Sequence, residues 1–109
     1  MKTKYRNKKT AFDGKNFDSI KERDYYIKLK LRERLGEIVD LKCQSKFELI
    51  PKQDGERSVS YVADFDYFDN QLGSRVVVDV KSKMTKQLPA YIIKRKLMLF
   101  IHKIKLVEI

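Results

Sequence analysis

The sequence predicts a mixed α/β domain with one central sheet flanked by helices. Three observations predict this class: a capped helical pattern over residues 19–35, a run of three apolar segments separated by turn signals between residues 46 and 81, and a second helical pattern after Pro89. Strand and helix patterns that alternate within so short a chain indicate that both build the same core. The 109 residues suit one domain, which we assign to residues 9–109.

The N-terminal part of the chain shows a charge signal and a turn signal. Residues 1–8 are predicted to form a basic arm, because the first nine residues hold five cations and no acid. Asp13-Gly14, between Phe12 and Phe17, predicts a tight hairpin turn, since glycine adopts positive φ without a steric penalty.

The first helix is predicted from Ser19 to about Leu35. Ser19 caps it, Glu22 three residues later completes a capping box, and Gly36 ends it. Apolar side chains fall on two opposite faces, which predicts a helix sandwiched between neighbours. One face holds Ile20, Ile27, Leu31, Leu35 and Ile38, and the other holds Glu22, Tyr25, Tyr26 and Leu29.

Three strands and a second helix are predicted next. After a linker, residues 46–50 form a strand, residues 52–55 turn, residues 58–68 form a second strand, residues 69–74 turn again, and residues 75–81 form a third. The second helix runs from Ala90 to about His102 with Pro89 at its start, and residues 105–109 close the chain as a short strand.

Charge is the strongest signal from composition. Lys and Arg number 25 against 15 acids, which gives a net charge of +10, and residues 80–107 contain eight cations and no acid. Such segregated charge favours a polyanionic partner, most often nucleic acid, although a basic soluble protein is the plainer interpretation. The single Cys43 fits a reducing compartment, and the absence of a long apolar run argues against a membrane span, so we expect a cytoplasmic protein.

A candidate catalytic constellation lies on the second and third predicted strands. Because strand side chains alternate in direction, Asp79 and Lys81 share one face of the third strand, and Asp64 and Asp66 share one face of the second. The same rule places Tyr61, Ala63, Phe65 and Tyr67 together on the opposite face. If the two strands pair as a hairpin, Asp64 approaches Asp79.

Two neighbouring carboxylates favour a cation between them, because they repel each other and are costly to bury. Mg²⁺ or Mn²⁺ fits, since Mg²⁺ takes oxygen ligands from one or two carboxylates. The plainer alternative is an exposed salt bridge of Asp64, Asp79 and Lys81, worth about 0–1 kcal/mol. His102, the lone histidine, is expected to be a surface or packing residue.

These residues resemble the PD-(D/E)XK nuclease superfamily, whose core follows the order α-β-β-β-α-β of a restriction-endonuclease-like fold. Asp64 in YVADFDYF matches the first motif acid, and Asp79-Val80-Lys81 matches the (D/E)-X-K element. More narrowly, the chain resembles a small phage-borne group of uncharacterised proteins in that superfamily, over stretches from Tyr5 to Ser82. Ala63 stands where the superfamily often has proline, which makes the motif less specific.

The resemblance implies a Mg²⁺-dependent endonuclease acting on DNA. Asp64, Asp79 and the Val80 carbonyl would hold the metal, with Lys81 as a catalytic residue. Glu22 matches a helix glutamate near the metal, but it serves equally well as the predicted helix cap. Supporting residues would be Gln44 and, as a neighbouring or alternative ligand, Asp66.

Contacts with DNA are expected from cations outside this constellation. The candidates are Lys8, Lys9, Lys83, Lys86, Lys94 and Arg95, which are either phosphate contacts or solvated surface cations. By analogy with junction-resolving members of the superfamily, branched DNA processed in phage recombination is one expected substrate, and symmetric cutting would need a homodimer. For a phage-encoded protein the compartment is the host cytoplasm. The alternative to an enzyme is a non-catalytic DNA-binding or protein-interaction module on the same fold.

Overall fold

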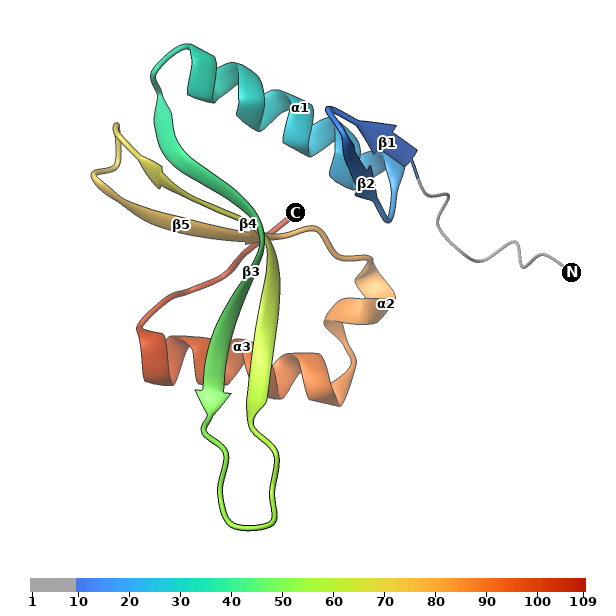
Figure 1. Ribbon diagram of the computed structural model, residues 1–109, viewed down its shortest axis with the longest axis vertical. Helices are drawn as coiled ribbons and strands as arrows, with labels where there is room; N and C mark the ends of the chain where they lie inside the picture. The colour runs from blue at the N-terminus through green and yellow to red at the C-terminus, as the bar shows by residue number, and fades with distance from the viewer. Residues whose placement is uncertain (1–9) are drawn as a thin grey trace, which may run out of the picture.

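A four-stranded sheet in the order β3-β4-β5-β6 forms the centre of the protein, with helix α1 at one end of the β3–β4 hairpin and helix α3 at the other (Figure 1). The computed structural model describes residues 10–109; the predicted basic arm, with Lys8 and Lys9, lies outside them. The main elements follow the order α1-β3-β4-β5-α3-β6, so the predicted mixed α/β class and its α-β-β-β-α-β order are confirmed.

The N-terminal hairpin and first helix form as the sequence predicts. β1 (Thr10–Phe12) pairs with β2 (Lys15–Phe17) around Asp13-Gly14, both of which have positive φ, as a two-residue hairpin turn requires. In α1 (Ile20–Arg34) the Ser19 hydroxyl caps the helix by accepting a hydrogen bond from the Glu22 amide at 3.1 Å.

The prediction that α1 is sandwiched between neighbours is wrong. Only the face with Glu22, Tyr26 and Leu29 is buried against the sheet. The other apolar face is exposed at Ile20, Ile27, Leu31 and the C-cap residue Leu35. One apolar face suffices to attach the helix, because the main sheet and the β1–β2 hairpin, whose Phe17 packs on Tyr26, both cover it.

The sheet is longer at its first strand than the sequence predicts. β3 (Ile38–Ile50) includes residues 38–45, which we expected to be a linker, because they pair with the far end of β4 (Val59–Asp69). β5 (Ser74–Asp79) pairs antiparallel with β4, and β6 (Val107–Glu108) pairs parallel with β5.

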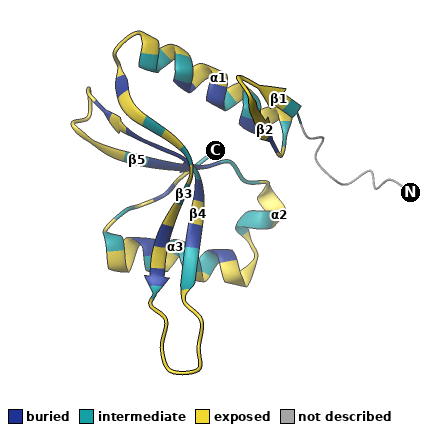
Figure 2. Ribbon diagram, in the orientation of Figure 1, coloured by how far each residue is buried: buried dark blue, intermediate teal, exposed yellow. Residues whose placement is uncertain are grey.

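The remaining elements lie around this sheet. The exposed turn between β3 and β4 projects from the body (Figure 2). A short helix that we did not predict, α2 (Lys83–Lys86), precedes α3 (Pro89–His102). Within residues 10–109, no helix has the length and apolar character needed to cross a membrane.

The core is divided into two hydrophobic clusters, and this corrects the face assignment made from strand alternation. Tyr61 and Ala63 belong to the cluster against α3, whereas Phe65 and Tyr67 belong to the cluster against α1. The change therefore falls between Ala63 and Phe65, at Asp64. In this part of β3, Gln44 has a left-handed φ of 55°, so regular alternation does not continue along the whole hairpin.

Candidate active site

The structure brings Asp64 and Asp79 together where β4 and β5 separate. Phe65 and Val78 form the last pair of the β4–β5 ladder, so Asp64 and Asp79 occupy the next opposing positions. There the Asp64 Oδ2 accepts a hydrogen bond from the Val80 backbone amide at 2.7 Å. The Asp64 carboxylate thus accepts a hydrogen bond from the backbone of β5 where the ladder ends, and it is close enough to Asp79 to raise the pKa of that carboxyl.

Asp79 is fully buried and only partly satisfied. Its Oδ2 accepts a hydrogen bond from the Tyr61 hydroxyl, while its Oδ1 has no hydrogen-bond partner among the described residues. The Lys81 Nζ lies 3.5 Å from that Oδ1. A buried acceptor without a hydrogen bond is costly, and such an atom in a folded protein requires an explanation.

The acidity of the site reflects burial and mutual repulsion. Burial, followed by the neighbouring Asp64 carboxyl, raises the pKa of Asp79 to about 7, against the lowering effects of the Tyr61 hydroxyl and of Lys81. Burial and the charges of Asp64 and Asp18 raise the pKa of Glu22 to about 7. The charge of Asp64 thus opposes the ionisation of both Asp79, on the neighbouring strand, and Glu22, on α1.

Glu22 is turned toward this site, beside Gln44. The Gln44 side-chain amide donates to the Glu22 Oε2 at 3.4 Å, and the charge of Asp64 is felt at Glu22. The amide of Glu22 completes its half of the cap with Ser19, while its carboxylate is available to the site. Only the Ser19 half of the predicted capping box is found among the described residues, since no hydrogen bond joins the Ser19 amide to the Glu22 carboxylate; the role of that carboxylate as a metal ligand stays a prediction.

A divalent cation fits the residues present. The open Oδ1 of Asp79 and the neighbouring Asp64 provide carboxylate oxygens, and Mg²⁺ is typically held by one or two carboxylates with water and phosphate in its other positions. Over residues 10–109, no three His, Cys, Asp or Glu side chains gather closely enough to form a metal cluster by themselves. Asp64 and Asp79 are the carboxylates that would hold the ion, and the Val80 carbonyl and Glu22 stay predicted ligands.

A second set of contacts lies behind Lys81, and the sequence did not reveal it. The Tyr91 hydroxyl donates to Glu108, whose Oε2 lies 3.6 Å from the Arg95 guanidinium, and the Lys81 ammonium lies 5.8 Å from the centre of the Tyr91 ring. The backbone of Ile109 bridges the site, since its amide donates to the Asp79 carbonyl and its carbonyl accepts from the Lys81 amide. These contacts fix the strand end that carries Asp79 and Lys81.

Tyr61 was missed because alternation placed it on the face opposite Asp64. The change of face at Asp64 brings its hydroxyl to Asp79. The contact of Tyr91 with Glu108 depends on the docking of α3 against β6, for which the local sequence carries no signal.

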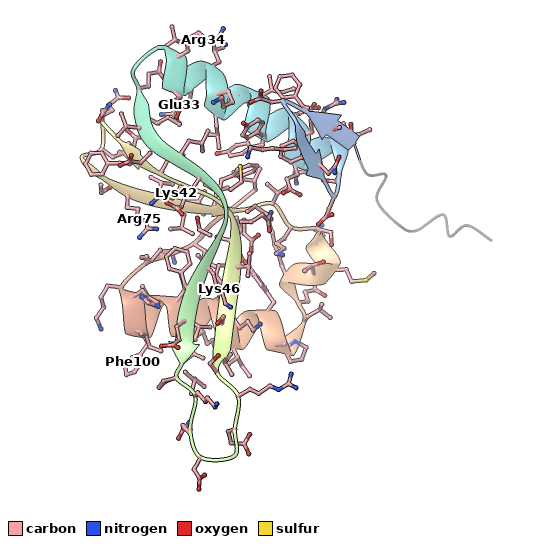
Figure 3. All side chains as sticks on the ribbon, in the orientation of Figure 1. Glu33, Arg34, Lys42, Lys46, Arg75 and Phe100 are labelled. Atoms are coloured by element: carbon pink, nitrogen blue, oxygen red, sulfur yellow. The ribbon has the colours of Figure 1, made fainter. Side chains whose placement is uncertain are left out.

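Asp66 does not join the acid pair. It is buried and paired with Arg75, whose Nη2 lies 3.1 Å from its Oδ1. Arg75, labelled in Figure 3 near the middle of the β3–β4 hairpin, also lies 5.0 Å from the centre of the Phe47 ring. Asp66 is therefore held by a structural ion pair, away from the hydrogen bonds that join Asp64 and Asp79 to Val80 and Tyr61.

The predicted DNA contacts occupy the helices that follow the site. Lys83 and Lys86 lie on α2, and Lys94 and Arg95 lie on α3. Lys94 and Lys81 line the same groove. Arg95 is partly engaged by Glu108, so it is the least free of the four to meet a phosphate.

The family model described as Protein of unknown function (DUF1064) matches residues 2–108, so the chain belongs to this family. No curated protein and no solved structure shows a significant match to the chain.

Proposed function

We propose that this member of the family is a metal-dependent endonuclease of the PD-(D/E)XK type that hydrolyses phosphodiester bonds in DNA. One observation carries the proposal: the buried Asp79 keeps an oxygen open beside Asp64 and Lys81, at the end of a β hairpin. The alternative of an exposed salt bridge is poorly supported, because Asp79 is fully buried and lies beside a second acid that repels it.

In this proposal two acids and a backbone carbonyl bind the metal, and Tyr61 orients one of the acids. Asp64, Asp79 and the Val80 carbonyl would bind a Mg²⁺ or Mn²⁺ ion, which when bound polarises the phosphate and makes a water molecule a better nucleophile. Tyr61 orients the Asp79 carboxylate through its hydroxyl. The Tyr61 hydroxyl engages Oδ2, so the oxygen without a hydrogen bond from a described residue is Oδ1, which the Lys81 ammonium approaches to 3.5 Å.

Lys81 provides a positive charge on the same side of the strand end. Its ammonium lies 3.5 Å from Asp79 Oδ1, and its side chain is 27% exposed, so it faces both the acid pair and solvent. In that position it would stabilise the negative charge that grows on the phosphate oxygens during cleavage.

The charge distribution supports DNA as the substrate. The net charge is +10, and residues 80–107, which follow Asp79 along the chain, contain eight cations and no acid. Such a surface attracts the phosphate backbone without reading sequence. Selectivity for a DNA structure, such as a branch, is therefore proposed ahead of selectivity for a base sequence.

The test is a cleavage assay on labelled linear and four-way DNA, with Mg²⁺, with Mn²⁺ and with a chelator. The wild-type protein is expected to cut when a metal is present and to be inactive with the chelator. Asp79→Ala is expected to abolish cleavage while it keeps or improves DNA binding, because it removes a negative charge beside a polyanion. A wild-type protein that binds DNA but cuts neither substrate under any condition would instead be a DNA-binding module.

A further inference from the structure

A groove of about 360 Å³ adjoins the acid pair, between β4, the segment that contains α2, and the first turn of α3. It shares two residues with the site, because Tyr61 and Lys81 form part of its wall. Tyr61 donates to Asp79 and Lys81 lies 3.5 Å from the same carboxylate. A ligand in the groove would therefore lie directly beside a phosphate bound at the acid pair.

The lining of the groove combines positive charge with exposed apolar surface. Lys81 and Lys94 supply two cations, and no acidic side chain of residues 10–109 lines it. Val62 and Leu88 supply aliphatic walls that are 44% and 50% exposed. A ligand that carries both a phosphate and a flat, weakly polar ring satisfies both parts of this surface, because the ring would cover the aliphatic groups and the phosphate would meet a lysine.

Size restricts that ligand to a small unit. A volume of about 360 Å³ lies at the low end of the roughly 300–1,000 Å³ range of small-molecule sites. One nucleotide fits this volume, whereas a DNA double helix does not. In a duplex the faces of each base are covered by its stacked neighbours. Only a base that is unpaired and unstacked can place its ring against Val62 and Leu88.

The wall next to the site is held in position by the protein itself. Lys81 is fixed between Asp79 and the ring of Tyr91, and the Tyr91 hydroxyl donates to Glu108. The groove thus does not need a large rearrangement to accept a ligand, which lowers the entropic cost of binding.

We propose that this groove binds one unpaired nucleotide adjacent to the phosphate at the acid pair, so that the substrate is DNA with a single-stranded segment or a splayed junction. This inference rests on the proposed nuclease function and specifies its substrate class. It assigns Val62 and Leu88 to contact with the base, and Lys94 to contact with the neighbouring phosphate.

The test measures binding rather than cleavage. Fluorescence anisotropy in chelator compares the affinities of the full-length protein for a duplex, a single strand and a splayed-arm DNA. The double variant Val62→Ser and Leu88→Ser removes the aliphatic walls without changing charge. Leu72→Ser, at a residue 69% exposed in the β4–β5 turn, is the matched control.

The double variant is expected to weaken binding of the single strand and the splayed arm by about tenfold, on the order of the contribution of one stacked base, and to leave duplex affinity unchanged. Leu72→Ser should bind all three as the wild type does. A 2-aminopurine at the unpaired position next to the junction should change its fluorescence on binding to the wild type and not to the double variant.

Two results would contradict the assignment of the groove as a nucleotide site. One is that the double variant and the wild type bind the splayed arm with equal affinity; the other is that the double variant loses the same affinity for duplex and for splayed DNA. If the wild type cuts DNA and the double variant gives either of these binding results, only the groove assignment fails. If the wild type never cuts DNA but the double variant loses affinity only for unpaired DNA, the nuclease function fails and the groove remains a DNA-binding site.

Discussion

Two buried aspartates at opposite ends of the β4–β5 hairpin have opposite surroundings. At the turn end, Asp69 accepts hydrogen bonds from the backbone amides of Gln71 and Leu72 at 2.9 and 3.0 Å and from Arg32 at 3.1 Å. At the other end, Asp79 has the Tyr61 hydroxyl on one oxygen, while the other has no hydrogen bond from a described residue and lies 3.5 Å from the Lys81 ammonium, with a second acid beside it.

The difference appears in the acidity of the two groups. The Leu72 amide, with Arg32 and the Gln71 amide, lowers the pKa of Asp69, whereas burial and Asp64 raise the pKa of Asp79 to about 7. Asp69 is satisfied by the fold and stabilises the turn. Asp79 is left incomplete by the fold, which is the property expected of a residue that binds something else.

Substitution of each aspartate by asparagine gives the largest expected contrast. Asp79→Asn should reduce metal-dependent cleavage at least about a hundredfold, because a neutral amide no longer supplies a charged ligand. Asp69→Asn should leave the cleavage rate per folded molecule unchanged and lower the midpoint of thermal unfolding by a few degrees. Single-turnover kinetics and circular dichroism measure both. Comparable cleavage by Asp79→Asn and the wild type would remove the distinction between the two residues.

Asp79 and Asp69 should also differ in how they change the free energy of unfolding with pH. The folded protein keeps a proton on Asp79 up to a pKa of about 7, while the unfolded chain loses it near 3.8, so without metal the free energy of unfolding should fall as the pH rises from about 4 to 7. Glu22 contributes with the same sign. Asp69 contributes the opposite sign, with stability lost as the pH falls below about 4.

Urea unfolding in chelator at several pH values measures this dependence. Asp79→Asn should flatten the decline between pH 4 and 7 and leave the acid limb intact. A variant with the same decline as the wild type would show that Asp79 is not the group that holds the proton.

Removal of the Tyr61 hydroxyl should have a moderate effect. Tyr61→Phe leaves Asp79 Oδ2 buried without its donor, which typically costs about 1–3 kcal/mol. Tyr91→Phe, whose partner Glu108 is less buried, should cost less. Chemical denaturation with both variants gives the comparison, and an equal or reversed order would contradict the view that the acid pair is the more tightly enclosed site.

The smallest effects are expected for the cations of α2. Lys83→Ala and Lys86→Ala should each reduce the slope of log affinity against log salt by about 0.9 if the side chain contacts a DNA phosphate. Lys52→Ala, in the exposed β3–β4 turn, is the matched control and should leave the slope unchanged. Identical slopes for all three variants would show that Lys83 and Lys86 of α2 do not contact DNA phosphates.

Local signals predicted most of the fold. Ser19, the Asp13-Gly14 turn and Pro89 each act through neighbouring residues, and each element they mark lies where the sequence predicts it. The features that were missed depend on distant partners. Residues 38–45 form a strand because they pair with β4, and the outer face of α1 is exposed because no other element of the described chain packs over it.

The sequence predicted the two motif acids of the candidate site but not the side chains that surround them. Asp64 and Asp79 follow from strand pairing, which the turn at residues 69–74 makes evident. Tyr61 could not be assigned to Asp79, because the change of face at Asp64 depends on how the whole hairpin twists over two helices.

The acid pair is tested most directly by a titration of the purified protein with Mn²⁺ at neutral pH, followed by electron paramagnetic resonance. We expect a saturable site that is lost in Asp79→Asn and in Asp64→Asn and is retained in Asp69→Asn. Binding that persists in both Asp79→Asn and Asp64→Asn, or no saturable binding by the wild-type protein, would contradict the claim that this acid pair is a cation site.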